Sequence, residues 1–264
     1  MNFMSVLFVV IAAASSSPGF SAHAKLPSPF NTEVHLQICN VAYGQLKENL
    51  GLSSQDRFDS KVYFIDTNEL DLYHNKTIVR VKFTDASKAH IDLKLRPVDF
   101  ERIHPDWFAL KGFRCEFDEH INKTVPSCRL RQKSAKSHVT RILRKQTELN
   151  FLLNDDQSDL VNEVNQLDPF DLALKAYGPV STAKWQLDIE ATFADELNVE
   201  VWFLGEEIIA ELSTRCETAD KQRALSYLKD FARAYGFDVC ENQISKTAAT
   251  LEHLQSTETV AIRP

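Results

Sequence analysis

Three pairs of basic residues stand out because each pair is spaced two residues apart within an apolar run. The pairs are Arg80 and Lys82, Lys94 and Arg96, and Arg129 and Arg131. A β-strand points successive side chains to opposite faces, so each run predicts a strand with one apolar and one cationic face. Guanidinium and ammonium groups gathered on one face are suited to phosphate oxygens. We therefore take these six cations as candidate phosphate-binding residues.

Acidic residues occur in the same kind of alternating run or in other strand-like segments. Four of them are candidate ligands for a divalent metal ion: Glu33, Asp188, Glu190 and Glu211. Carboxylate oxygens are the protein ligands that Mg²⁺ and Mn²⁺ prefer. Ordinary salt bridges to the cations are the alternative role for the same residues.

A second acidic pair, Glu116 and Asp118, precedes the basic pair Arg129 and Arg131 in what reads as a hairpin. Opposed strands bring side chains on one face within reach of each other. We expect these two acids to pair with the two arginines across the hairpin.

Two arrangements explain a charged face that recurs on nearly every strand. The face could cover the solvent side of an open antiparallel sheet whose apolar side is packed on helices. Alternatively, the strands could close into a barrel with the charges inside. Nine strand candidates are enough to close a barrel: 32–38, 61–67, 77–84, 89–96, 113–118, 126–133, 184–193, 198–204 and 207–214. The separation of cations from carboxylates along the chain favours the closed form.

Helices are expected between and after these strands. Apolar residues at helical spacing predict helices at 43–49, 137–154 and 218–235, a shorter one around residues 160–167, and a further one running to Tyr177. Their apolar stripes need a partner, so they should pack on the outside of the strands. The predicted fold class is α+β: an antiparallel, eight-stranded, tunnel-like barrel with helices packed outside.

The ends of the chain suggest export. An apolar run from Val6 to Ala14 is followed by Ala22-His23-Ala24, which is typical of a leader and its cleavage site. We expect a cleaved signal peptide at 1–24, one domain at 25–240 with a helical insert at 137–180, and a C-terminal tail at 241–264. The predicted location is periplasmic or secreted, with no stable membrane insertion after cleavage. A retained membrane anchor is the alternative.

Charge limits the partners. The formal net charge of -7 argues against DNA and anionic membranes, but allows a local basic cavity. The expected partner is a phosphate-rich or other anionic small molecule.

Five cysteines fall after the expected leader, in a compartment that permits disulfides. Cys115 and Cys128 lie near the ends of the predicted hairpin and are expected to pair. Cys216 with Cys240 is the second expected bridge, which leaves Cys39 over. Buried thiols without a bridge are the alternative.

Several of these strands carry a recognisable series of residues. Phe64-Ile65-Asp66-Thr67 is followed by Leu72, then by Val79-Arg80-Val81-Lys82, and then by Asp92-Leu93-Lys94-Leu95-Arg96. This order and spacing resembles the CYTH superfamily, the triphosphate tunnel metalloenzymes, over about residues 32–236. The resemblance implies an eight-stranded antiparallel tunnel in which cations bind a triphosphate and acids bind Mg²⁺ or Mn²⁺. Further acids on the late strands would then include Glu200.

The opening strand departs from that family. Where the family has Glu-x-Glu-x-Lys, this chain has Glu33, His35 and Gln37. Histidine can ligate a metal but adds no negative charge, and glutamine cannot neutralise phosphate. Lys82 also stands where the family has a second arginine.

Two functions follow from these expectations. The first is metal-dependent hydrolysis of a triphosphate or polyphosphate in a charged tunnel. The second is a non-catalytic exported protein that binds a phosphorylated or other anionic ligand in the same tunnel.

Overall fold

The computed structural model describes residues 30–84, 87–145 and 148–261. Within these ranges the chain forms one continuous sheet. Its strands are β1 (Asn31–Cys39), β2 (Phe58–Asp66), β3 (Thr77–Phe83), β4 (Lys88–Leu95), β5 (Phe113–His120), β6 (Lys123–Ala135), β7 (Lys175–Ala191), β8 (Ala194–Leu204), β9 (Glu207–Glu217) and the short β10 (Asp238–Val239).

The sheet closes on itself into a barrel. The strand order is β1-β5-β6-β4-β3-β2-β7-β8-β9, and β9 pairs with β1 to complete the ring, while β10 extends one end of β1. Nine strands thus form the wall in the described residues, not the eight that were predicted. A closed ring of an odd number of strands cannot alternate direction throughout. The single parallel pair, β1 with β5, resolves this mismatch, so the barrel is mixed and not purely antiparallel.

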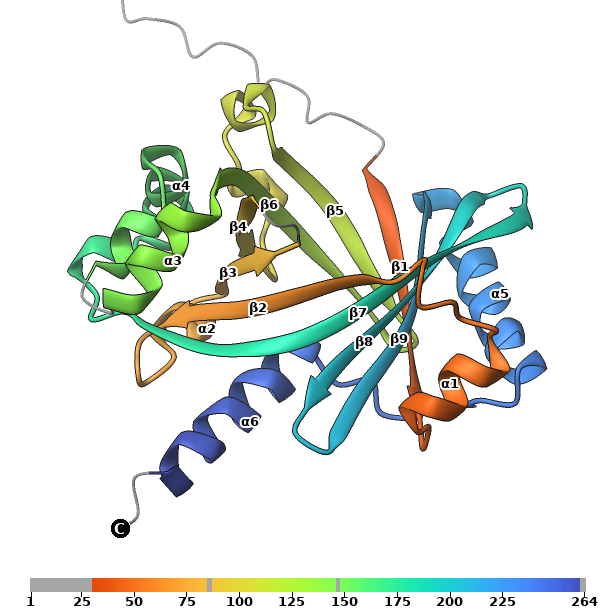
Figure 1. Cartoon of the computed structure of the whole chain (residues 1–264). Coiled ribbons are helices and arrows are strands. Elements are labelled where there is room, and N and C mark those ends of the chain that lie inside the picture. Colours follow the sequence, from red (N-terminus) through yellow and green to blue (C-terminus); the bar gives the residue numbers. More distant parts are fainter. Residues whose placement is uncertain (1–29, 85–86, 146–147, 262–264) are drawn as a thin grey trace, which may run out of the picture.

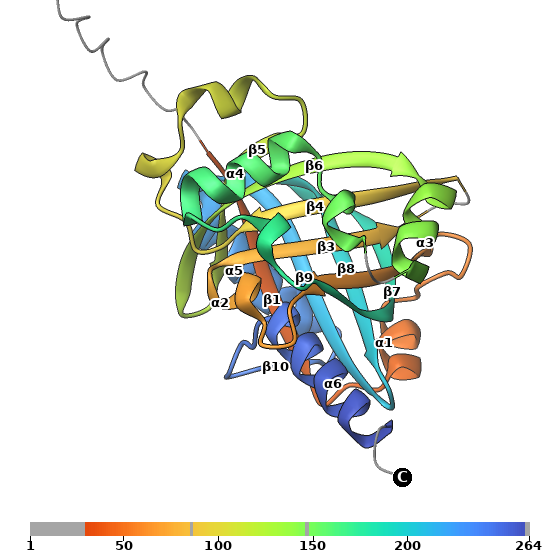
Figure 2. The same cartoon turned by 90° about the vertical axis from the view of Figure 1, so that its left-hand side faces the viewer.

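Helices lie outside most of the barrel (Figures 1 and 2). They are α1 (Tyr43–Asn49), α2 (Asp71–His74), α3 (Lys136–Lys145), α4 (Asp155–Asn165), α5 (Lys221–Ala234) and α6 (Lys246–Ala261), with short 3-10 turns at Phe100–Arg102, Pro105–Ala109, Leu149–Leu152, Pro169–Asp171 and Thr218–Asp220. The α+β class is confirmed.

The predicted helix running to Tyr177 is wrong, because β7 already begins at Lys175. Gly178 and Pro179, which directly follow the predicted end of that helix at Tyr177, lie within the strand. The β2–β7 register shifts between Val62 and Phe64, opposite Gly178, which has a φ of +116°. A bulge tolerates both a glycine and a proline, which explains why the sequence pattern was misread. The helical insert therefore ends before residue 175.

Apolar side chains face outward from the barrel, where the helices cover them. Val79, Ile91, Leu93 and Leu130 belong to a buried cluster that also contains side chains of α3 and α4. A second cluster joins β1, β8 and β9 to α1 and α5. The alternating charges therefore point into the barrel, and the alternative of a solvent-covered sheet face is excluded.

The third apolar cluster has a different position. Val62 and Phe64 of β2 lie directly opposite Lys82 and Arg80 in the sheet, so they face the same inward side. They are buried together with Leu251 of α6. The helix α6 therefore packs against inward-facing residues of the wall. Figure 2 shows where this helix lies relative to the strands. The stretch predicted as a C-terminal tail contains this helix.

Two disulfides connect cysteines of the described residues. Cys115–Cys128 joins β5 to β6, as predicted. The other expected bridge is wrong: Cys39 pairs with Cys240, and Cys216 is a buried free thiol. The pairing of β10 with β1 places Asp238 opposite Cys39, which carries Cys240 to it; sequence spacing gave no signal for this contact.

The predicted signal peptide lies outside the described residues. Among those that are described, no helix is long and apolar enough to cross a membrane.

Candidate functional site

A cavity of about 500 Å³ occupies the barrel interior. Among the residues that line it are ten lysines and arginines and six aspartates and glutamates. The inside of the barrel is therefore cationic, although the whole chain is acidic. Each of the six predicted phosphate-binding residues lines this cavity: Arg80, Lys82, Lys94, Arg96, Arg129 and Arg131.

One wall, formed by β3, β4 and β6, holds arginines around a single buried acid, Asp92. The register places Arg80, Asp92 and Arg131 side by side on three neighbouring strands. Arg131 donates from Nη2 to Asp92 Oδ2 at 2.9 Å, Arg80 donates to the same oxygen at 3.2 Å, and Arg129 Nε lies 3.8 Å from Asp92 Oδ1. Burial raises the pKa of Asp92, but the arginines outweigh burial and hold it well below its usual range. Three cations share one carboxylate, so the wall keeps a surplus of positive charge.

The expected hairpin pairing of Glu116 and Asp118 with Arg129 and Arg131 is wrong. In the β5–β6 register, Arg129 lies opposite Arg114, while Glu116 lies opposite Ser127 and Asp118 opposite Val125. A shift of the assumed register by a few residues is enough to exchange partners across a hairpin.

Asp118 instead binds cations of the β4 strand end. Its Oδ2 lies 2.9 Å from Lys94 Nζ and 3.1 Å from Arg96 Nε. Arg96 also donates to Nε2 of His120 at 2.6 Å, and burial, together with His35 and Arg96, lowers the pKa of His120 to about 3. His120 is therefore neutral at physiological pH and helps to orient Arg96.

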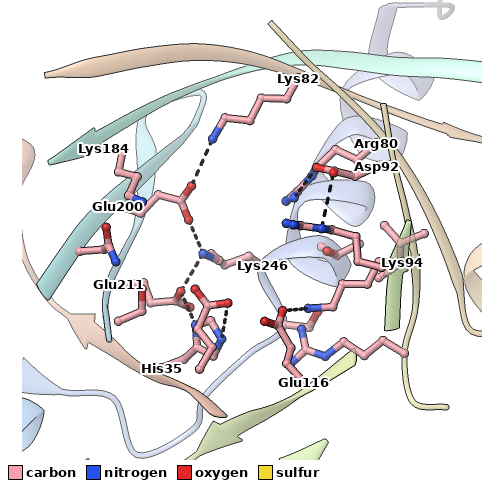
Figure 3. A pocket seen from close by; sticks show the side chains of 18 of the residues that line it. His35, Arg80, Lys82, Asp92, Lys94, Glu116, Lys184, Glu200, Glu211 and Lys246 are labelled. Atoms are coloured by element: carbon pink, nitrogen blue, oxygen red, sulfur yellow. Dashed lines mark hydrogen bonds and ion pairs between the residues drawn. The ribbon is translucent and has the colours of Figure 1, made fainter. Parts of the chain in front are cut away.

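The opposite wall, formed by β1, β8 and β9, carries the carboxylates. Glu33, Glu196, Glu200 and Glu211 all line the cavity. Glu200 and Glu211 lie directly opposite each other on β8 and β9. Figure 3 shows Lys246, the first residue of α6, reaching between them.

Lys246 binds both of these carboxylates. Its Nζ donates to Glu211 Oε1 at 2.7 Å and also to Glu200 Oε2. Burial lowers the pKa of Lys246, but the two carboxylates outweigh burial and raise it above its usual range. Lys82 approaches Glu200 from the other side, at 3.8 Å, and burial lowers the pKa of Lys82 to about 8.

A second group, formed by β1 and its neighbour β5, could hold a metal ion: Glu33, His35 and Asp118, which each offer a ligand atom within 4.8 Å of the others. His35 donates from Nδ1 to Glu211 at 2.9 Å. Its Nε2 is buried without a hydrogen-bond partner, 3.6 Å from Asp118 and 4.0 Å from Glu33. A buried nitrogen facing two carboxylates is suited to a cation or to a proton of its own.

The protonated state of His35 follows from the same neighbours. Burial lowers the pKa of His35, but Glu211, Asp118 and Glu33 outweigh burial and raise it to about 9. A metal ion at this position must therefore displace a proton from the imidazole.

The predicted metal ligands divide into two pairs. Glu33 and Glu211 lie in the cavity, as expected. Asp188 and Glu190 are exposed and do not line it. Asp188 lies opposite Glu196 in the ladder but near the end of the β7–β8 hairpin, and the register shifts just beyond it. The structure therefore does not bring these two acids to the site, because β7 is 17 residues long and extends past the cavity.

Several lining residues were missed from the sequence: Asp92, Arg114, Lys184, Glu196, Arg215 and Lys246. Those on strands follow the same two-residue spacing as the predicted cations, so the alternation could have identified them. Lys246 has no such signal, because it follows the strands in what was interpreted as a tail.

Gln37, which replaces the lysine of the resembled family, has a structural role. Its side-chain amide accepts from the backbone N–H of Ile244 at 2.9 Å and donates to the backbone carbonyl of the same residue. The backbone of Gln37 accepts from Cys240 N and donates to the Gln243 side chain. Lysine has no acceptor and could not make this pair of bonds. Gln37 thus fastens the segment that leads to Lys246.

No protein family model and no curated protein matches the sequence. Solved structures do match the fold. The candidate adenylyl cyclase HpAC1 from Hippeastrum, for which a dominant triphosphatase activity is described, aligns with a TM-score of 0.56 and 16% identity over 83% of this chain and 94% of its own. A candidate adenylate cyclase from Bacillus halodurans aligns with a TM-score of 0.55 and 12% identity over 83% of this chain and 96% of its own.

The alignments cover most of this chain at low identity and show that it shares the fold of these two proteins. The charged interior described above is an observation on this chain itself. The barrel fold that the resemblance implied is therefore shared with these two solved structures.

Proposed function

We propose that the barrel binds a triphosphate or polyphosphate and hydrolyses its terminal phosphoryl group with the aid of Mg²⁺ or Mn²⁺. The observation that carries this proposal is the division of the cavity into two walls. Arginines and lysines of β3, β4 and β6 face carboxylates of β1, β8 and β9, with cations in excess. A row of phosphates needs a cationic wall along its length, and a metal ion needs carboxylates nearby.

Phosphoryl transfer depends mainly on positioning and on charge stabilisation. Arg80, Arg129 and Arg131 would stabilise the charge that spreads over the oxygens of the transferred group. Asp92 holds these guanidinium groups in place before the ligand arrives. Their orientation therefore costs little when the reaction takes place.

The metal would be held by Glu33, His35 and Asp118. The unpartnered Nε2 of His35 and the two facing carboxylates fit a cation, and this mixture of imidazole and carboxylate favours Mn²⁺ over Mg²⁺. When bound, the ion would neutralise phosphate charge and lower the pKa of a water molecule. Glu196 could orient that water, because among the described residues its carboxylate accepts from the amides of Gln186 and Asn198 and not from a cation.

Binding without hydrolysis is the second candidate. Other acids of the cavity already have a cation from the protein: Glu33 has Arg215, Glu116 has Arg114, and Glu211 has Lys246. A metal ion must compete with these partners. This observation favours a tunnel that holds its anion without reacting with it.

Phosphate release from tripolyphosphate and ATP separates the two candidates. The purified protein is assayed with Mg²⁺, with Mn²⁺ and with EDTA. Hydrolysis requires turnover that EDTA abolishes, and Arg131→Ala should lower kcat/KM by about 100-fold or more. Arg233→Ala, in an exposed arginine on α5, is the control and should match the wild type.

Calorimetric titration of the same proteins with tripolyphosphate completes the test. No turnover, together with binding that Arg131→Ala weakens, would establish the binding tunnel. Neither turnover nor binding in the folded protein would refute both candidates.

Export remains part of the proposal. The disulfides Cys39–Cys240 and Cys115–Cys128 support it, because such bonds persist mainly in oxidising compartments. The substrate would then be a phosphorylated anion in the periplasm or outside the cell.

A further inference from the structure

Lys246 occupies a position that would otherwise suit a divalent cation. Glu200 and Glu211 stand opposite each other on adjacent strands; Glu211 is buried and Glu200 is partly buried. Two facing carboxylates, completed by water, are a common way to hold Mg²⁺ or Mn²⁺. Here the ammonium group of Lys246 lies between them and binds both (Figure 3).

The segment before Lys246 is fastened to β1 at successive points. Asp238 and Val239 pair with β1 as β10, and Cys240 forms the disulfide with Cys39. Gln37 then binds Gln243 and both backbone groups of Ile244. Only one residue separates this last contact from Lys246. The lysine is therefore held at the carboxylate pair by its own segment.

The chain that follows Lys246 is held in place as well. The side chain of Ser245, just before α6, accepts from the backbone N–H of Ala248 in the first turn of the helix, and Leu251 of the helix is buried in one cluster with Val62 and Phe64. The ammonium group is thus supplied at a defined position, with little freedom to leave it.

We infer that Lys246 is a built-in cation that takes the place of a divalent metal ion between Glu200 and Glu211. The inference deepens the proposed function, because it assigns this part of the tunnel to a ligand that binds beside an ammonium group. An ammonium group has three N–H donors, and the two carboxylates use two of them. The third is available for a phosphate oxygen, so this end of the ligand needs no metal.

The same arrangement accounts for the altered opening strand. The cation that the resembled family places at position 37 is absent here, and Gln37 instead anchors the segment that supplies Lys246. The positive charge reaches the tunnel from the C-terminal segment in place of the first strand.

Counting bound Mn²⁺ by electron paramagnetic resonance tests the inference without any substrate. Lys246→Met removes the charge but keeps most of the side-chain volume, and should bind one more Mn²⁺ per chain than the wild type. Adding Glu200→Gln to Lys246→Met should return the count to that of the wild type. Lys184→Met is the matched control: Lys184 lies opposite Glu200 in the sheet but not between the two acids, so its loss should add no ion.

An equal count in wild type and Lys246→Met, with both proteins folded by circular dichroism, would overturn the inference. If Lys246→Met does not fold, Glu200→Gln in the otherwise unchanged protein decides the question. Its Mn²⁺ count should equal that of the wild type, because no ion occupies the pair. A lower count would show that a metal already binds there and would refute the inference.

Binding of tripolyphosphate in EDTA separates this inference from the proposed function. Lys246→Met should weaken metal-free binding about tenfold. Failure of the wild type to bind tripolyphosphate would refute the proposed function, while the Mn²⁺ counts would still decide the role of Lys246. Unchanged metal-free binding in Lys246→Met would refute the contact with phosphate.

Discussion

Glu211 accepts hydrogen bonds from two cations, His35 on β1 and Lys246 at the start of α6. Burial raises the pKa of Glu211, but these two neighbours lower it to about 2. At the residue scale the acidic wall is therefore a network in which each charge depends on the next. His35 is a member of this network whose charge changes within an accessible range of pH.

His35 should make stability depend on pH. Its pKa is about 9 in the folded protein and 6.5 in an ordinary histidine, so the folded state binds an extra proton between these values. The stabilisation is complete below pH 6.5 and is lost as the pH rises through about 9. With EDTA present, the unfolding free energy of the wild type should fall by on the order of 3 kcal/mol relative to that of His35→Gln as the pH rises across this window.

Guanidinium unfolding at a series of pH values measures this difference. His104→Gln is the control, because His104 is exposed and lies outside the cavity. If the difference in unfolding free energy between wild type and His35→Gln stays constant from about pH 6 to about pH 10, the neighbouring carboxylates do not stabilise a protonated His35.

At the element scale, the C-terminal segment is part of the wall of the tunnel. The register of β10, the disulfide Cys39–Cys240 and Gln37 together hold it against β1. The role of Gln37 is therefore to position another element and not to contact a ligand. This role gives a prediction for a variant that has lysine, the residue of the resembled family, at position 37.

Gln37→Lys should loosen the segment even though it restores the residue of the resembled family. Lysine can donate but cannot accept from Ile244 N–H, so one buried bond is lost and a charge is placed in a site with 4% exposure. Hydrogen exchange of residues 243–251 should become at least tenfold faster. We expect a loss of about 2 kcal/mol or more in unfolding free energy.

Mass spectrometry of exchanged peptides checks this prediction. Gln55→Lys, on an exposed turn, is the control and should leave exchange in the segment unchanged. Unchanged exchange in Gln37→Lys would mean that the disulfide and β10 hold the segment without the glutamine.

At the scale of the whole molecule, the barrel reverses the usual distribution of polarity. Apolar faces point out to the helices, and charges point into the cavity. Like charges held together inside a closed wall repel each other unless an anion joins them. A bound polyanion should therefore stabilise the whole fold.

Tripolyphosphate should raise Tm in spite of the net charge of -7. At about 100 times its dissociation constant the ligand adds about 2.7 kcal/mol, which corresponds to a shift of roughly 5–10 °C for a chain of this size. The shift should be smaller in high salt and smaller with orthophosphate. Scanning fluorimetry measures it, and no shift at any ligand concentration would argue against a polyanion site.

The sequence was sufficient for those features that depend on alternation along a single strand. The inward cations Arg80, Lys94 and Arg131 and the outward apolar residues beside them could be recognised because side chains of a strand alternate with a fixed period of two. The α+β class followed from the same reasoning. So did the Cys115–Cys128 bridge, whose two residues lie close together in the chain.

Contacts between distant segments were decided only by the tertiary structure. The β1–β9 pair that closes the ring, the parallel β1–β5 pair, the Cys39–Cys240 bridge and the entry of Lys246 into the cavity all join residues far apart in the chain. Periodicity tells which face a residue occupies, but not which strand will lie beside it or how far each strand extends. That is why Asp188 and Glu190, on a strand whose existence but not whose length was predicted, lie outside the site, while Lys246 lies at its centre. Closure of the barrel is a property of all the strands together, so it could not be deduced from any one of them.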